Sequence, residues 1–128
     1  MYAAQQKYRA LSIASRIEVA SPHELVTILY EELVGALDIT ATAVAQGKLE
    51  AYRASRERAS SILLALEASL DFERGGSVAR TLSEIYRAMQ KELSLCVQTG
   101  DAGKLKAIRG SVAELLAAWA KIRAREPA

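Results

Sequence analysis

Apolar residues recur along the last part of the chain at alternating steps of three and four. They are Leu105, Ile108, Val112, Leu115, Trp119 and Ile122, which would share one face of an α-helix. Two earlier segments carry similar stripes, at Tyr52, Ala59, Ile62, Leu63, Leu66 and Leu70 and at Val78, Leu82, Ile85, Met89, Leu93 and Cys96. Because such a stripe is stabilised by burial against a partner, these segments predict helices that pack on one another.

Capping residues and glycines divide the chain into helices. Ser21-Pro22-His23-Glu24 is typical of a helix start, because the serine can accept from the glutamate amide and proline needs no amide donor there. Gly47 and Gly100 can end helices, Gly75-Gly76 predicts a break, and Asp101 suits the position before a helix. The predicted helices span 22–46, 48–71, 77–99 and 102–123.

Four helices of similar length joined by short turns favour an all-α fold. We predict one domain over 1–128, an antiparallel up-and-down four-helix bundle, because each stripe then finds a neighbour. Residues 1–17 are expected to form a mobile N-terminal cap, a short helical or extended segment packed on the bundle.

The first long helix is apolar over more than half of its circumference. Its apolar positions are Leu25, Val26, Ile28, Leu29, Tyr30, Leu33, Val34, Leu37 and Val44, whereas a surface helix usually shows a stripe only somewhat wider than about 100°. Leu64 and Leu95 also lie far from the stripes of their helices. Two interpretations stay open: the helix is central and packed on two sides, or it forms part of a groove that receives another chain's amphipathic helix.

The N-terminal head lacks one clean apolar stripe. Tyr2, Ile13 and Ile17 could share a helical face, while Tyr8 and Leu11 point elsewhere. Such a segment exposes large apolar side chains to water, and a short isolated helix is only marginally stable. The hypothesis is a loosely held plug over the groove, displaced when a better partner arrives.

Composition narrows the classes of function. The 128 residues are 51% hydrophobic and carry a net charge of +2, which argues against disorder and gives no footprint for nucleic acid. Apolar stretches fall short of the roughly 20 residues that a membrane span needs, so no membrane insertion is expected. A single cysteine, Cys96, and the absence of a signal-peptide pattern favour a cytoplasmic protein.

The chain offers few residues for catalysis. One histidine, His23, and one cysteine cannot build the usual zinc sets; His23 is expected to be solvated and Cys96 to be a small core residue. Gly75-Gly76 is too short to cradle a phosphate. The sequence therefore predicts no enzyme activity, metal or cofactor.

Two blocks of sequence resemble a known family. VASPHELVTILYE, from Val19 to Glu31, is similar to the A-S-P-x-x-L-(I/V)-x-x-L-Y-(D/E) opening of the flagellin-specific export chaperones, the FliS family. SLDFERGG, from Ser69 to Gly76, resembles a second block of that family, and Leu115 to Trp119 its closing L-x-x-x-W. Glu32 stands where the family often has glycine.

The resemblance implies a cytoplasmic helical chaperone without catalytic activity. It would bind the C-terminal helical segment of flagellin, prevent premature polymerisation, and deliver its client to the export gate of the flagellar type III apparatus. An alternative is a structural, self-associating bundle that forms a homodimer or scaffold. The chaperone reading predicts a monomer or weak dimer when free.

The broad face of the first helix, with two tyrosines as anchors, supplies the candidate partner-binding residues. The full set is Tyr2, Tyr8, Ile13, Ile17, Leu25, Ile28, Leu29, Tyr30, Leu33, Leu37, Tyr86 and Met89; the alternative for each is core packing. On the groove hypothesis, Leu33→Asp would weaken client binding more than it destabilises the bundle.

Overall fold

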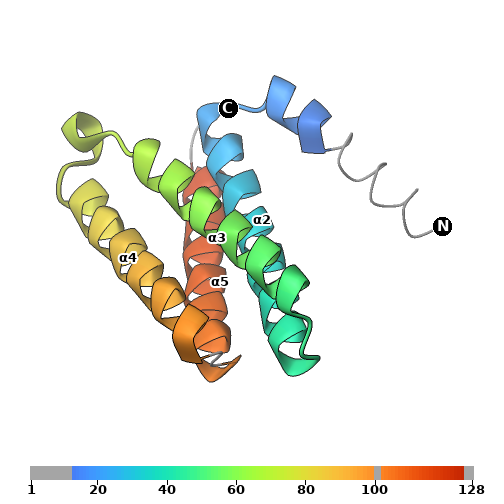
Figure 1. The fold of residues 1–128 in the computed structure, drawn as a ribbon. Helices are drawn as coiled ribbons and strands as arrows, with labels where there is room; N and C mark the ends of the chain where they lie inside the picture. The colour runs from blue at the N-terminus through green and yellow to red at the C-terminus, as the bar shows by residue number, and fades with distance from the viewer. Residues whose placement is uncertain (1–12, 100–101, 126–128) are drawn as a thin grey trace.

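The structure is a computed structural model that describes residues 13–99 and 102–125. Its main elements are α2 (Pro22–Ala45), α3 (Leu49–Ala68), α4 (Phe72–Thr99) and α5 (Ala102–Arg125). Consecutive helices run in opposite directions, and the described residues contain no strand (Figure 1). The prediction of an all-α helical bundle is confirmed.

The start and end of α2 follow the capping residues. The Glu24 amide donates to Ser21 Oγ at 3.2 Å, and Pro22 occupies the first turn. The helix ends at Ala45, and Gly47 follows with φ +68°, a conformation that glycine adopts without a steric penalty. The predicted roles of Gly100 and Asp101 lie outside the described residues.

The connection between α3 and α4 differs from the prediction. Helix α3 ends at Ala68 rather than at residue 71. Asp71 Oδ1 instead accepts from the amides of Glu73 and Arg74, both at 3.1 Å, and so caps a new turn that begins at Phe72. The predicted break is present at Gly76, whose φ of 50° and ψ of −123° kink α4.

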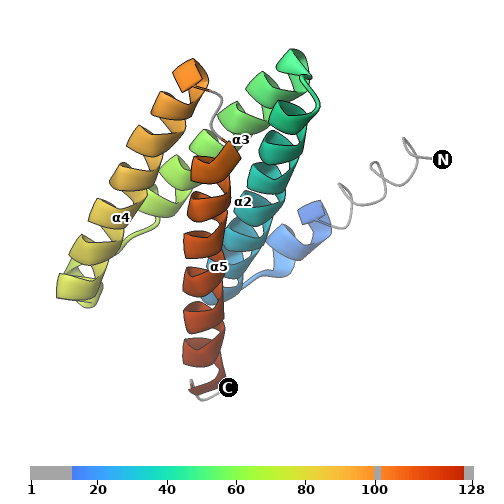
Figure 2. The same ribbon diagram turned by 90° about the horizontal axis from the view of Figure 1, so that it is seen from below.

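Helix α2 packs extensively against both α3 and α5, whereas α4 packs mainly against α3 and only sparsely against α5. In both views α4 and α5 lie close together where α4 ends and α5 begins, and they diverge toward their other ends (Figures 1 and 2). The shared core runs along α2. Its largest fully buried side chains include Tyr30, Leu33, Leu37, Leu63, Leu66, Tyr86, Leu93, Leu105, Ile108 and Val112.

For part of the predicted partner-binding face, the structure favours the alternative of core packing. Leu33 and Leu37 are fully buried, and Ile28, Tyr30, Tyr86 and Met89 are also buried. Neighbouring helices cover two sides of α2, so the bundle itself absorbs most of the wide apolar arc. Only Leu25 and Leu29 of the α2 candidates keep substantial exposed surface.

Residues 13–19 are the described part of the predicted plug, and they are helical. This segment lies on the side of α2 that faces away from α4 (Figures 1 and 2). Ile13 is partly buried, whereas the Ile17 side chain is 47% exposed. The segment lacks a clean apolar stripe, which is why little of it is buried. Tyr2 and Tyr8 lie outside the described residues.

We predict that Leu33→Ala lowers the free energy of unfolding by about 2–5 kcal/mol, because it leaves a cavity in a filled core. The matched control is Leu64→Ala on α3, where the side chain is 58% exposed, with an expected change within about 0.5 kcal/mol. Urea denaturation measures both. Equal effects of the two substitutions would contradict the placement of Leu33 in the core.

Candidate partner-binding furrow

The divergence of α4 from α5 leaves two adjoining cavities along this pair of helices, which together we call the α4–α5 furrow. The wide cavity measures about 670 Å³ and lies between the start of α2, the start of α4 and the end of α5. The narrow cavity measures about 540 Å³ and continues along the middle of α4 and α5. Apolar side chains line most of both.

The rim of the wide cavity carries apolar side chains with large exposed areas. Val78 of α4 is 65% exposed and Ile122 of α5 is 47% exposed, and Leu25 of α2 stands beside them as a third exposed residue. Leu29 and Leu82 are partly buried deeper in the same cavity. Grouped apolar surface of this kind marks interaction sites more often than scattered single residues do.

The extra turn before Gly76 explains why the furrow is open. The chain forms one helical turn over 72–75 and then changes direction at Gly76 before the long part of α4 begins. In Figure 1 the start of α4 lies beside the end of α3 and away from the end of α5. The apolar stripes of α4 and α5 therefore continue past the point where the two helices touch.

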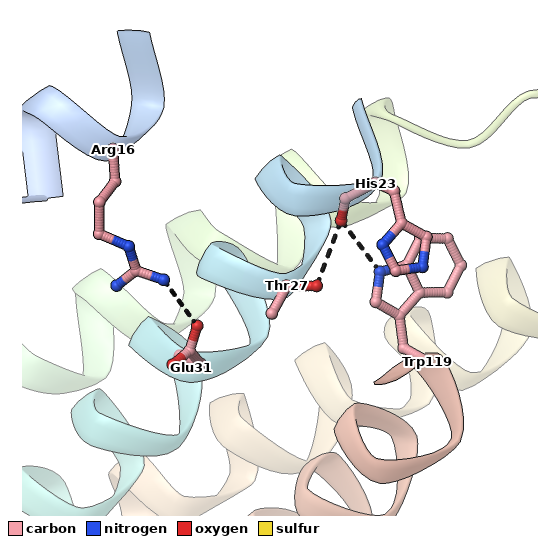
Figure 3. A network of polar contacts seen from close by, with 5 residues as sticks. All are labelled: Arg16, His23, Thr27, Glu31 and Trp119. Atoms are coloured by element: carbon pink, nitrogen blue, oxygen red, sulfur yellow. Dashed lines mark hydrogen bonds and ion pairs between the residues drawn. The ribbon is translucent and has the colours of Figure 1, made fainter. Parts of the chain in front are cut away.

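A cluster of aromatic residues holds the end of α5 against the start of α2. The Trp119 indole N–H donates to the carbonyl oxygen of His23 at 3.1 Å, and the two rings stack with centroids 4.3 Å apart (Figure 3). Trp119 also meets the edge of Tyr30, with centroids 6.5 Å apart. These contacts fix one wall of the wide cavity.

His23 is therefore not solvated, contrary to the sequence prediction. Its ring lies on Trp119, and within the described part of the chain both ring nitrogens are buried without a hydrogen-bond partner. Its carbonyl oxygen also accepts from Thr27 Oγ1 at 3.2 Å. The residue thus joins two helices through its backbone and its ring face. Cys96, in contrast, is a buried free thiol, as predicted.

Two tyrosines form the floor of the wide cavity. The hydroxyls of Tyr30 on α2 and Tyr86 on α4 are hydrogen-bonded to each other. Burial raises the pKa of both phenols above the usual value, and the hydrogen bond to Tyr30 raises the pKa of Tyr86 further. Both groups therefore stay neutral at physiological pH and link α2 to α4 beneath the furrow.

The structure divides the α2 and α4 candidates among four places. Leu25, Leu29, Tyr30 and Tyr86 line the wide cavity, and Met89 lines the narrow one. Ile28 instead lines a small cleft, together with Arg16. Arg16 forms an ion pair with Glu31 at 3.0 Å (Figure 3). Leu33 and Leu37 line neither cavity of the furrow.

Sequence reasoning missed several furrow residues. Val78, Leu82, Trp119 and Ile122 belong to regular apolar stripes, and the sequence analysis assigned such stripes to the interior. The signal that points to them is the glycine pair at 75–76, because a kink directly before a stripe can move its first turns away from the neighbouring helix.

The described residues hold no group of three or more histidine, cysteine, aspartate or glutamate side chains that could bind a metal ion. No helix in the described ranges has the length and apolar character to cross a membrane. The molecule is a helical bundle with mainly apolar surface between two of its helices. Helix-in-groove recognition uses surfaces of this kind.

Comparison with known proteins assigns the family. The family model of the flagellar protein FliS matches residues 4–126, so the chain belongs to the FliS family. It is 31% identical to the flagellar secretion chaperone FliS of Salmonella typhimurium over 95% of this chain and 93% of the relative. It is 29% identical to the flagellar secretion chaperone FliSB of Pseudomonas aeruginosa, over 93% of this chain and 96% of the relative. The family predicted from the sequence motifs is confirmed.

The tyrosine pair predicts a loss of stability at high pH. Unfolded tyrosines ionise near pH 10, whereas Tyr30 and Tyr86 hold their protons in the fold. The contribution of the two tyrosines to the free energy of unfolding is therefore complete below about pH 10. It falls as the pH rises further, by up to about 1.4 kcal/mol per pH unit for each group. Urea denaturation between about pH 8 and 11 measures it.

Tyr86→Phe should lower stability at neutral pH, because it leaves the buried Tyr30 hydroxyl without its partner, at a cost of about 1–3 kcal/mol. The variant should also lose less stability than the parent between neutral and alkaline pH. An identical alkaline decline in both proteins would show that Tyr86 ionises normally in the fold.

Proposed function

We propose that this protein is a chaperone for flagellin and that the α4–α5 furrow holds part of flagellin's C-terminal helical segment. The family is one of flagellar secretion chaperones, and the observation that carries the proposal is the furrow itself. A flagellar subunit awaiting export has amphipathic segments whose apolar faces become buried only on assembly. A cover for such a face is what an apolar furrow supplies.

The length of the furrow suits a helix. Its α4 wall runs from Val78 to Glu92, and its α5 wall from Ala107 to Ile122. At 1.5 Å per residue each wall is about 21–23 Å long, which matches four turns of a client helix. The helix would bury its apolar stripe between two walls that already carry apolar stripes of the same period.

Different candidate residues serve different roles in this proposal. Leu25 and Leu29 contact the client directly, because they have exposed surface in the wide cavity. Tyr30, Tyr86 and Met89 form the floor beneath it. Leu33 and Leu37 act only indirectly, by holding α2 in the core.

The later steps of the proposal concern delivery. A client held in this way is kept from polymerising in the cytoplasm, and the chaperone–client complex then meets the export gate. No chemical step is needed, because binding and release of a helix fulfil the task. In this proposal the residues before 13, which include Tyr2 and Tyr8, also contact the client, and a separate surface of the chaperone meets the gate.

Co-expression with flagellin tests the client. The full chain should co-purify with intact flagellin, and deletion of flagellin's C-terminal helical segment should abolish the complex, because that segment supplies the apolar face. Survival of the complex after the deletion would refute the proposal. Sedimentation of the free chain tests the alternative: a self-associating structural bundle would sediment as a stable dimer.

Two exposed apolar residues, one inside the furrow and one outside it, test whether the furrow binds the client. We predict that Val78→Asp weakens flagellin binding tenfold or more, about 1.4 kcal/mol, because it puts a charge on the apolar rim. Leu64→Asp is the control, since Leu64 has similar exposure on α3 and lines neither cavity. Both side chains are exposed, so both variants should keep their thermal stability. Isothermal titration measures the affinities, and equal losses would place the client elsewhere.

A further inference from the structure

The narrow cavity differs from the wide one in its charge. Only two charged side chains line it, Glu92 on α4 and Glu114 on α5, so each wall contributes one carboxylate. Between them lie the apolar side chains of Ile85, Met89, Ile108 and Leu115. The wide cavity, in contrast, is lined by one acid and one base, Asp71 and Arg74, which form an ion pair with each other.

Neither glutamate is neutralised by the chain itself. Within the described residues, Glu92 and Glu114 have no hydrogen-bond or ion-pair partner, although other exposed acids do, such as Asp38 with Arg109 and Glu31 with Arg16. Side chains three or four positions away on a helix are the ones that could pair with them. The residues at these positions around Glu92 and Glu114 are all uncharged: Ala88, Met89, Leu95, Cys96, Gly110, Ser111, Ala117 and Ala118.

This local acidity runs against the character of the whole chain. The net charge is +2 and the isoelectric point is near 8.8. At physiological salt, charges separated by more than about 8 Å are largely screened from each other. Lys91, Lys106 and Arg109 lie on the same two helices but do not line the cavity, so a helix seated in it would lie directly against the two carboxylates.

We propose that the narrow cavity selects a client helix with lysine or arginine on both flanks of its apolar stripe, and that Glu92 and Glu114 pair with these flanks. The stripe packs between α4 and α5, and one basic side chain reaches the carboxylate on each wall. This inference rests on the proposed function, because it assumes that the furrow holds a helix. It adds the charge pattern and hence the specificity of that helix.

Designed peptides test the charge preference. Two helical peptides share one leucine stripe, contain no tryptophan, and carry either lysine or glutamate on both flanks. Trp119 is the only tryptophan of the chain and lines the wide cavity, so its fluorescence reports filling of the furrow by each peptide. The full chain should bind the lysine peptide about threefold to tenfold more tightly at low salt, a range expected for two exposed charge pairs.

Substitution of the two glutamates gives the decisive comparison. E92Q/E114Q should remove the preference for the lysine peptide, and E92K/E114K should reverse it. The matched control is E57Q/E84Q, which changes the net charge by the same amount at exposed residues that line neither cavity; it should keep the preference. High salt should reduce the preference in the parent chain.

Several outcomes would overturn the inference. They are equal binding of the two peptides by the parent chain, or an unchanged preference in E92Q/E114Q. A stable dimer whose Trp119 responds to neither peptide would show that a second copy fills the furrow. Failure of the proposed function would give another result: flagellin would not bind to the chain, but the chain would still prefer the lysine peptide. Flagellin binding without any peptide preference would overturn the charge inference alone.

Discussion

Burial of α2 between α3 and α5 is the constraint on which the rest of the structure depends. Its fully buried residues, Leu33 and Leu37 among them, fill the space that both neighbours share. Burial of apolar surface is the main favourable contribution to folding, and among the described residues α2 contributes more buried apolar side chains than any other helix. Because α3 and α5 both pack extensively on α2, α4 packs mainly against α3 and only sparsely against α5.

The open furrow is a consequence of this arrangement rather than a separate addition. A symmetric four-helix bundle would close the α4–α5 seam along its full length. Here the capped turn after Asp71 and the kink at Gly76 set the first turns of α4 apart from α5. The Trp119–His23 contacts meanwhile hold the end of α5 on α2. The apolar stripes of α4 and α5 are left with surface that a client helix can cover, and the tyrosine pair seals the core beneath.

Much of the fold was predictable because its signals are local. Ser21 and Pro22 begin α2, Gly47 follows its end, and Gly76 marks the kink, each through a backbone preference of one residue or its near neighbours. The end of α3 was misplaced because Asp71 caps a new turn instead of continuing the helix. The site was predicted only in part. Leu25 and Leu29 line the furrow, whereas Leu33 and Leu37 do not, since the width of an apolar arc does not tell which of its sides a neighbour covers.

The sequence by itself determined the helices, their order and the family, because these depend on capping residues, on periodicity and on motifs that are read along the chain. Only the tertiary structure decided which apolar residues form the core and which line the furrow. Val78 and Leu105 occupy equivalent positions in their stripes, yet one is mostly exposed and the other is fully buried. The difference arises from the distance between neighbouring helices at each level, a quantity set by the packing of all the helices together.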